Sequence, residues 1–454
     1  MKYLWAAAIA AVVVVVGVGS RDTQTIAAAA GACPSITTPS ISSPHAPSDV
    51  CIPDGFTNVP MEYFDDYSWK MFVSQVWPAA EGKRGVANSR KGIGDSGPRV
   101  FETYKALWEI FHRDGSDPPP DFNRYDLADA NACGEQPKFG ELVFASFSGI
   151  DDIGQAGNGT LEAPLVARNG KYVRYLTFFN KIAFDHIVSN QLYLRSHIPA
   201  VPRPRPRTPV MSFPDGAITI KSAWIDVDGL PESLRKRMYT RPALMRTAGS
   251  TQCAHVTVGL VGLHIAQKTA SRPQWIWSSF EQEDAIPPGR PNAPGIYLFN
   301  DGTNSPMPAA NPLQLSPLAP EPVKPFNVVR AELASIHPAT VLTNFTYQNL
   351  MPRAPWQYYK LVTTQWPRLE GNQAVPVPAA QDGSVPNTFP GPDAFSAFAN
   401  VTMETFDQGR VQLGCMNCHN EARMQADFMW TILDHAYPPQ FAASAKNSET
   451  ATTK

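Results

Sequence analysis

The sequence predicts an α+β protein with a central antiparallel β-sheet, flanking helices and many proline-rich loops. Residues 217–227 alternate apolar and polar side chains, which is the two-residue period of a strand, and residues 252–268 form a long strand-like run. Segments before and after this block repeat apolar side chains at helical spacing. The 44 prolines fall largely in runs. Because proline fixes φ and removes a hydrogen-bond donor, these runs are expected in loops.

Helices are expected on both sides of the strand-rich block. In residues 60–77 the side chains of Tyr63, Tyr67 and Met71 recur every four residues, so they share one helix face. Residues 171–197 also favour a helix, although they begin with β-branched and aromatic side chains. The remaining helices are expected at residues 101–112, 328–336, 340–351, 394–406 and 420–435, and two further strands at 274–280 and 295–300.

The first thirty residues predict an export signal, and therefore a periplasmic or otherwise exported protein. Lys2 supplies the short positive start, residues 4–18 are almost wholly apolar, and residues 27–30 are alanines that suit a cleavage site. An uncleaved N-terminal membrane anchor and lipid attachment at Cys33 are the alternatives. We expect no stable membrane span in the mature chain, because nothing after residue 20 is long and apolar enough.

One main domain with short flanking segments is expected. A signal peptide at 1–30 and a flexible lead-in at 31–57 precede an α+β domain at 58–392. A C-terminal helical segment at 393–440 packs on that domain, and a disordered tail follows at 441–454. The composition, 43% apolar and 17% charged, is typical of a globular chain. A net charge of −2 without clustered Lys and Arg argues against a nucleic-acid partner.

Four of the six cysteines stand outside the C-terminal segment, at positions 33, 51, 133 and 253. An even number of cysteines in an exported chain predicts two disulfides. Three pairings are possible, and the sequence does not choose among them. Cys33 and Cys51 are one candidate pair, because their bond would close the lead-in segment. Free buried thiols are the alternative.

The C-terminal segment contains Cys415-Met416-Asn417-Cys418-His419, which matches the Cys-x-x-Cys-His signature of covalent haem attachment. Two thiols add to the two vinyl groups of one porphyrin, and the two intervening residues let one helical turn span that edge. The histidine after the second cysteine then reaches the iron. We therefore expect one covalent haem c, held by Cys415 and Cys418, with His419 as the proximal iron ligand.

Two other chemistries use paired cysteines. A thiol redox site usually follows a strand at the start of a helix, whereas a helical segment and a loop precede this motif. A zinc site needs further Cys or His residues at ligand spacing, and none stands nearby in the sequence. The export signal agrees with haem attachment, which takes place outside the cytoplasm.

The second axial position of the iron is expected to be built by the upstream domain, because only 35 residues follow His419. His264 is the first candidate ligand, since it shares a strand face with apolar side chains and needs a partner there. A core histidine bonded to the backbone is the alternative for that residue. His255, on the opposite strand face, and Met403, twelve residues before Cys415, are further candidates. An open or water-occupied position is also possible.

The chain resembles a family of exported bacterial cytochrome c proteins, most of which have no assigned activity. The resemblance covers most of the mature chain and rests on residues 258–265 (VGLVGLHI), 275–281 (WIWSSFE), 400–406 (NVTMETF) and the motif at 415–419. It implies periplasmic haem binding and electron transfer, without a substrate. The haem motif alone is specific enough to assign roles, to Cys415, Cys418 and His419.

Three functions agree with these expectations. The first is electron transfer by a periplasmic mono-haem c-type cytochrome that exchanges electrons with a redox partner protein. The second is a haem enzyme, peroxidase- or oxidase-like, whose open iron site in the upstream domain acts on a small-molecule substrate. The large region outside the motif favours the second, since electron transfer needs only about a hundred residues of packing. The third is a haem-based sensor or binding module.

Overall fold

A computed structural model gives the arrangement of most of the chain. It describes residues 33, 37–53, 61–126, 137–138, 140–144, 153, 156, 164–203, 209–248, 252–288, 295–302, 320–325, 327–332, 335–366, 399–408 and 415–438. The expected leader at 1–30 and tail at 441–454 lie outside these residues. No helix among the described residues is long and apolar enough to cross a membrane.

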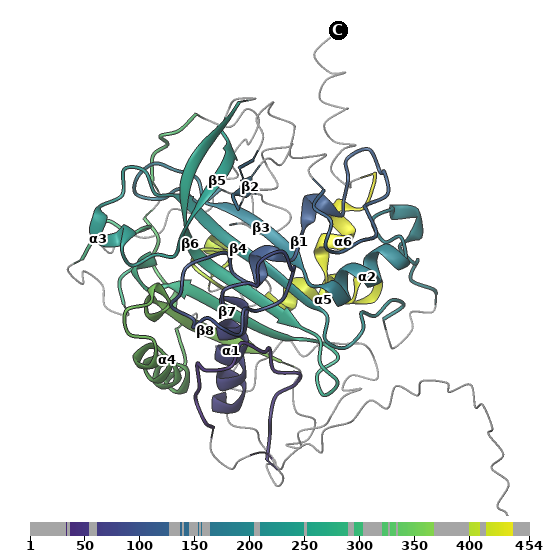
Figure 1. Ribbon diagram of the computed structural model, residues 1–454, viewed down its shortest axis with the longest axis horizontal. Helices are drawn as coiled ribbons and strands as arrows, with labels where there is room; N and C mark the ends of the chain where they lie inside the picture. The colour runs from purple at the N-terminus through teal and green to yellow at the C-terminus, as the bar shows by residue number, and fades with distance from the viewer. Residues whose placement is uncertain are drawn as a thin grey trace, which may run out of the picture.

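Eight strands of the described chain form one mixed sheet, which agrees with the α+β class (Figure 1). The sheet curls into a half-barrel with the order β1-β3-β4-β6-β5-β2, and β7 lies between β6 and β8. All pairs are antiparallel except β2 with β5, which is parallel and corrects the expectation of a purely antiparallel sheet. The strands are β1 (Lys105–Ala106), β2 (Leu142–Phe144), β3 (Arg174–Phe179), β4 (Ile218–Asp226), β5 (Thr240–Arg246), β6 (Cys253–Gln267), β7 (Ile276–Gln282) and β8 (Tyr359–Gln365).

The long strand β6 lies at the centre of the sheet. Its residues from Val258 to Gln267 pair with β4 along one edge. The other edge is divided between β5, which pairs with residues 253–259, and β7, which pairs with residues 262–267. Residues 258–263 of β6 are all buried, as a strand covered on both faces requires. The alternation in residues 217–227 and the strand-like run at 252–268 therefore predicted β4 and β6 correctly.

Helices α1 (Met61–Gln75) and α4 (Pro338–Leu350) cover one face of β7 and β8. The Ser68 hydroxyl of α1 is hydrogen-bonded to the hydroxyls of Ser278, at 2.7 Å, and Thr364, at 2.8 Å. The Asp65 carboxylate accepts from the hydroxyls of Thr340, at 2.6 Å, and Thr364, at 2.8 Å. Hydroxyl groups thus satisfy the polar atoms that this helix buries. Both helices were expected from helical spacing.

The helix expected at residues 101–112 is wrong. This segment forms two short 3₁₀ turns, Phe101–Thr103 and Leu107–Glu109, separated by β1. Lys105 and Ala106 pair with Phe179 and Phe178 of β3, so pairing with a distant strand replaces the helical ladder. The Glu109 carboxylate fixes the second turn by accepting from the backbone N–H of Ala106 at 3.0 Å.

Residues 171–197 contain a strand before their helix. β3 occupies the β-branched and aromatic start of the segment, and α2 (Lys181–Ser189) begins after Asn180. The Asn180 side chain accepts from the backbone N–H of Ala183 at 3.0 Å, which caps the helix. The sequence analysis also missed β5 and β8.

Three further expectations fail in the described residues. Residues 295–300 form bends instead of a strand, and the described part of 328–336 contains no α-helix. The described part of 394–406 forms turns that end in a 3₁₀ turn, Thr405–Asp407. The final helix is divided into α5 (Cys415–Ala426) and α6 (Trp430–His435), because Asp427 and Phe428 adopt positive φ angles of 47° and 73°.

The lead-in segment is closed by a disulfide between Cys33 and Cys51. Cys253 is also disulfide-bonded. Three of the four cysteines outside the motif are therefore oxidised, as expected for an exported chain. Because the Cys33 sulfur is bonded to Cys51, it has no free thiol for lipid attachment.

We expect Asp65→Asn to flatten the pH dependence of stability. Burial raises the pKa of the Asp65 carboxyl to about 7, against about 3.9 in an unfolded chain. Between these values the folded protein holds a proton that the unfolded chain lacks. The contribution of Asp65 to stability is therefore complete below about pH 4 and is lost as the pH rises to 7. Urea unfolding should show a loss of about 3 to 4 kcal/mol over this range that Asp65→Asn lacks.

Asp185→Asn is the matched control, because Asp185 is an exposed carboxylate paired with Lys181 in α2. Its unfolding free energy should follow that of the wild type at every pH. Parallel curves for the wild type and Asp65→Asn would contradict the raised pKa of Asp65.

Candidate functional site

The Cys-x-x-Cys-His motif forms the first turn and a half of α5. Residues three and four apart on a helix lie on the same side. The helical register therefore places Cys415, Cys418 and His419 along one side of α5. Cys418 is a free, half-buried cysteine, whereas the side chain of Cys415 lies outside the described atoms. This arrangement suits attachment of both cysteines to one edge of a planar group.

His419 is held in a single orientation by one hydrogen bond and one ring contact. Its Nδ1 lies 2.7 Å from the carbonyl oxygen of Phe428. Its ring centroid lies 4.4 Å from that of Trp277, with 44° between the planes. Burial, with a smaller effect from the positive charge of Lys221, lowers the pKa of His419 to about 4. The imidazole is therefore neutral at pH 7.

A neutral imidazole next to a carbonyl oxygen carries its proton on the nitrogen that faces that oxygen. The proton of His419 is thus assigned to Nδ1, and Nε2 keeps an unshared electron pair. Within the described part of the chain, Nε2 has no hydrogen-bond partner. This is the protonation state in which a histidine binds a metal.

The Cys418 thiol is unlike that of a redox or zinc-binding cysteine. Burial, together with the carboxylates of Glu404 and Glu421, raises the pKa of the Cys418 thiol to about 11. Nucleophilic and zinc-binding cysteines work as thiolates and have lowered pKa values. No group of three or more His, Cys, Asp and Glu side chains placed to hold a metal ion occurs among the described residues.

One face of the sheet carries a line of half-buried residues opposite α5. Thr177 of β3, Lys221 of β4 and His264 of β6 are direct cross-strand neighbours. Each is half-buried, although the residues beside it in its strand are buried. Trp277 of β7 is half-buried in the same way and lies diagonally next to His264. Half-buried positions within a covered sheet leave these four side chains partly accessible to solvent.

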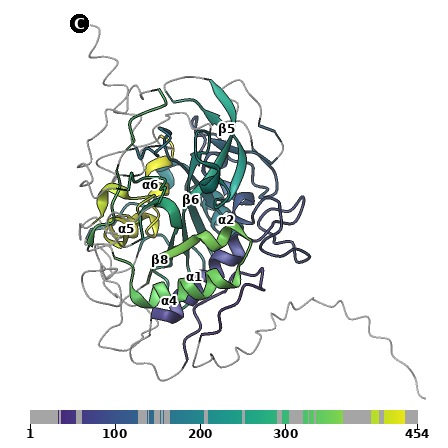
Figure 2. The same ribbon diagram turned by 90° about the vertical axis from the view of Figure 1, so that its left-hand side faces the viewer.

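The segment 399–408 crosses the same face next to these residues. The Asn400 amide donates to the Ser279 hydroxyl at 2.9 Å, and the backbone N–H of Val401 donates to the Glu281 carboxylate at 2.7 Å. Ser279 and Ser278 point to opposite faces of β7, so this segment and α1 lie on opposite sides of the strand. Figure 2 shows α5 and α6, in yellow, apart from α1 and α4, with strands between them.

Glu404 approaches His264 from this segment. Its carboxylate oxygen Oε2 lies 3.6 Å from Nε2 of His264. That nitrogen is buried and has no hydrogen-bond partner, which is costly for a polar atom. Burial and the charge of Lys221 hold the pKa of His264 well below its usual range. Burial raises the pKa of the Glu404 carboxyl to about 7.

His264 and His419 belong to one neighbourhood. A positive charge on His419 would further lower the pKa of His264, so the two imidazoles lie within electrostatic reach of each other. Trp277 joins them, because its ring contacts His419 and its strand position is diagonal to His264. The structure thus brings together the two histidines that the sequence analysis ranked first.

The two further candidate ligands differ in position. His255 is exposed near the start of β6, where its Nδ1 lies 2.9 Å from a carboxylate oxygen of Glu141. Met403 is fully buried in an apolar cluster, and its sulfur packs against Gly262, two residues from His264 on the same strand face. Met403 therefore lies at the border of the candidate site and His255 lies away from it. Ligation of iron by either residue stays a prediction.

Sequence reasoning missed Lys221, Glu404 and Phe428. Lys221 reaches the site only through the register of β4 on β6, and Glu404 reaches it through the path of segment 399–408. Phe428 contributes a backbone carbonyl, which every residue type has. The sequence contains one indication of Glu404, which is that it directly follows Met403, already a candidate iron ligand.

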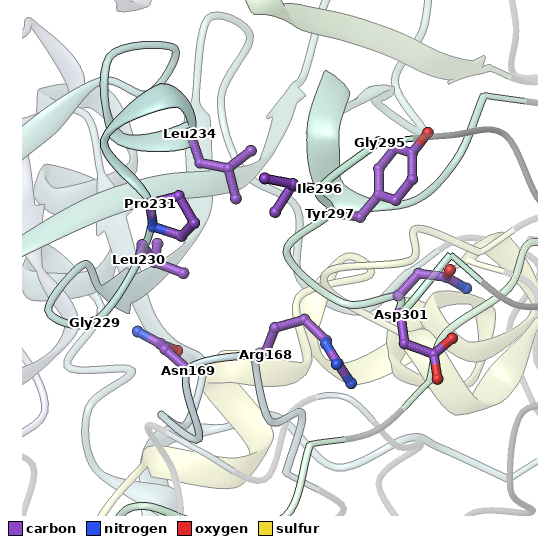
Figure 3. Close-up of a pocket in the computed structure, with 11 residues that line it drawn as sticks. Arg168, Asn169, Gly229, Leu230, Pro231, Leu234, Gly295, Ile296, Tyr297 and Asp301 are labelled. Carbon is purple, nitrogen blue, oxygen red and sulfur yellow. The ribbon is translucent and has the colours of Figure 1, made fainter.

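A separate cavity of about 330 Å³ lies at the other end of β4 (Figure 3). Leu230, Pro231 and Leu234 line one side, and Arg168 and Asp301 lie across from them. None of its lining residues is among those that surround His419 and His264. The cavity is therefore not part of the candidate site.

No family model, curated protein or solved structure matches the chain.

We expect Gly262→Ala to destabilise the packing of segment 399–408 on β6. A Cβ at position 262 would lie 2.1 Å from Oγ1 of Thr402 and 3.2 Å from the sulfur of Met403. Overpacking of this kind costs about 1–3 kcal/mol, which urea unfolding would detect. Gly92→Ala is the control, because a Cβ there meets no atom within 4 Å. Equal stability of the two variants would show that the close approach at Gly262 is not needed.

Proposed function

We propose that this chain is an exported mono-haem c-type cytochrome that transfers electrons, with haem attached to Cys415 and Cys418 and His419 as the proximal iron ligand. The state of His419 is the observation that supports this most directly. Its Nδ1 faces the Phe428 carbonyl at 2.7 Å, and Nε2 has no partner in the described chain on a neutral, half-buried ring. A neutral histidine with Nδ1 bonded to a backbone carbonyl presents Nε2 as a metal ligand.

The residues around the motif fit a bound haem. The line of half-buried residues on the α5 side of the sheet is partly accessible to solvent, and Trp277 supplies a flat apolar surface beside His419. The lowered pKa of His419 keeps its imidazole available as a neutral ligand. A bound haem would supply reversible one-electron exchange at its iron. The chain would hold the ring in place and limit the access of water.

His264 is proposed as the second axial ligand of the iron. Its Nε2 is buried without a hydrogen-bond partner, and burial keeps the ring neutral. An iron atom would satisfy this nitrogen, which otherwise has only the Glu404 oxygen at 3.6 Å. Two histidine ligands would close both axial positions and suit an electron carrier.

Export and the electron partner are part of the same proposal. The Cys33–Cys51 disulfide supports an oxidising compartment such as the periplasm. We propose that the haem exchanges electrons there with a redox partner protein.

A haem enzyme acting on a small-molecule substrate is the second candidate function. The observation that favours it is the pair formed by His264 and Glu404, two groups that could take up and release a proton. In that case His264 would stay off the iron, and the second axial position would be open to peroxide or oxygen. The spin state of the iron separates the two functions.

Covalent haem should depend on Cys415 and Cys418. The wild-type chain, produced in a host that attaches haem to c-type cytochromes, should keep haem after denaturing electrophoresis. The double variant Cys415→Ala/Cys418→Ala should lose it, because no thioether bond can form. Haem staining of the gel and a pyridine haemochrome spectrum provide the measurement.

Cys33→Ala/Cys51→Ala is the matched control, since it removes two cysteines that are bonded to each other. It should keep covalent haem at the wild-type ratio. A wild-type protein without covalent haem would overturn the proposed function.

His264→Ala should open the iron. The wild type is expected to be low-spin and unresponsive to carbon monoxide, whereas His264→Ala should become high-spin and bind it. Optical spectra of the oxidised and reduced proteins provide the measurement. His255→Ala is the control and should keep the wild-type spectrum, because His255 contacts Glu141 instead. A high-spin wild type would exclude His264 as ligand and favour the enzyme.

A further inference from the structure

The turn between α5 and α6 has an unusual backbone. Asp427 and Phe428 are consecutive non-glycine residues with φ angles of 47° and 73°. Aspartate tolerates the left-handed region, but a bulky aromatic residue rarely adopts it. A conformation of this kind persists only when surrounding contacts impose it, and such conformations cluster at functional sites.

The turn directs a carbonyl group at the proposed iron ligand. Phe428 is itself one of the two residues with a positive φ angle. Its carbonyl oxygen accepts from Nδ1 of His419 at 2.7 Å. The Phe428 side chain is buried in the main apolar core. A continued helix would direct that carbonyl along the helix axis instead, towards its own next turn. The strained backbone therefore creates the hydrogen bond that orients His419.

Asp427 connects this turn to the central strand. Its side chain is 1% exposed, and its carboxylate lies 2.6 Å from Nζ of Lys268, the residue after β6. The same carboxylate oxygen accepts from the backbone N–H of Phe213 at 2.8 Å. Lys268 also donates to the carbonyl of Pro273 at 2.8 Å, so it is itself held in place. Removing one partner of a buried ion pair leaves the other charge uncompensated.

We propose that Asp427 is a positioning residue for His419: its ion pair with Lys268 holds the Phe428 carbonyl on Nδ1 and thereby sets the reduction potential of the haem. This rests on the proposed haem function. A hydrogen bond from the outer nitrogen of a ligating histidine makes the imidazole a stronger donor. A stronger donor favours ferric iron, so the bond keeps the potential low.

The midpoint potential of the full-length holoprotein tests this. Asp427→Asn keeps the shape of the side chain and its tolerance for positive φ but loses the charge that holds Lys268. We expect covalent haem to remain and the potential to rise. The ferric preference should fall at least threefold, which is a rise of roughly 30 mV at 59 mV per tenfold change. Lys268→Gln removes the other partner and should shift the potential in the same direction.

Glu109→Gln is the matched control for general destabilisation. Glu109 is also a buried carboxylate, 2% exposed and 2.8 Å from Arg84, and it lies outside the candidate site. This variant should lose stability and keep the wild-type potential. A shift equal to that of Asp427→Asn would overturn the proposal, since the effect would then be nonspecific.

The remaining outcomes also separate the two proposals. Covalent haem with an unchanged potential in both Asp427→Asn and Lys268→Gln would overturn the role of Asp427 and leave the cytochrome function intact. A wild type without covalent haem would overturn both. If Asp427→Asn does not fold, Lys268→Gln decides. In the haem-free chain, ¹⁵N NMR should find the His419 proton on Nδ1 in the wild type and partly on Nε2 in the variants.

Discussion

The structure depends on the pairing of β6 along both of its edges. Backbone groups of a buried strand need hydrogen-bond partners, and β4, β5 and β7 together provide them over the length of β6. This pairing fixes which side chains stand next to one another. It places His264 between Lys221 and Ser279. Gly262 has no side chain, so segment 399–408 can pack closely on the strand at that position. The two faces of the sheet then serve different purposes. One packs against α1 and α4 through hydroxyl groups, and the other borders the candidate site.

The helices and strands that were predicted correctly are those whose own residues show a clear helical or strand pattern. β4 alternates apolar and polar residues, β6 is a long strand-like run, and α1 and α4 repeat apolar residues at helical spacing, so each could be located from its own residues. The segment 101–112 also has helical spacing, but Lys105 and Ala106 pair with β3, which lies some seventy residues further along the chain. Short-range periodicity contains no information about such a pairing. The same reason explains the missed parallel contact between β2 and β5.

The candidate site divides in a similar way. Cys415, Cys418 and His419 are close together in sequence, so their pattern alone was enough to make them candidates for a shared site. His264 could be ranked above His255 because strand geometry puts them on opposite faces, and only His264 shares its face with apolar neighbours. Lys221 and Glu404 could not be found, because their approach depends on register and on the path of a turn. Phe428 acts through its carbonyl, and the identity of a side chain does not reveal where a carbonyl points.

The raised pKa of Cys418 also has a consequence for the maturation of the chain. Cys33, Cys51 and Cys253 form disulfides, and Cys418 must stay out of those bonds while they form. Thiol–disulfide exchange proceeds through the thiolate. With a pKa of about 11, only about one Cys418 thiol in ten thousand is ionised at pH 7. The folded environment of α5 therefore protects this thiol kinetically against mispairing, while the neutral sulfhydryl remains in place next to His419.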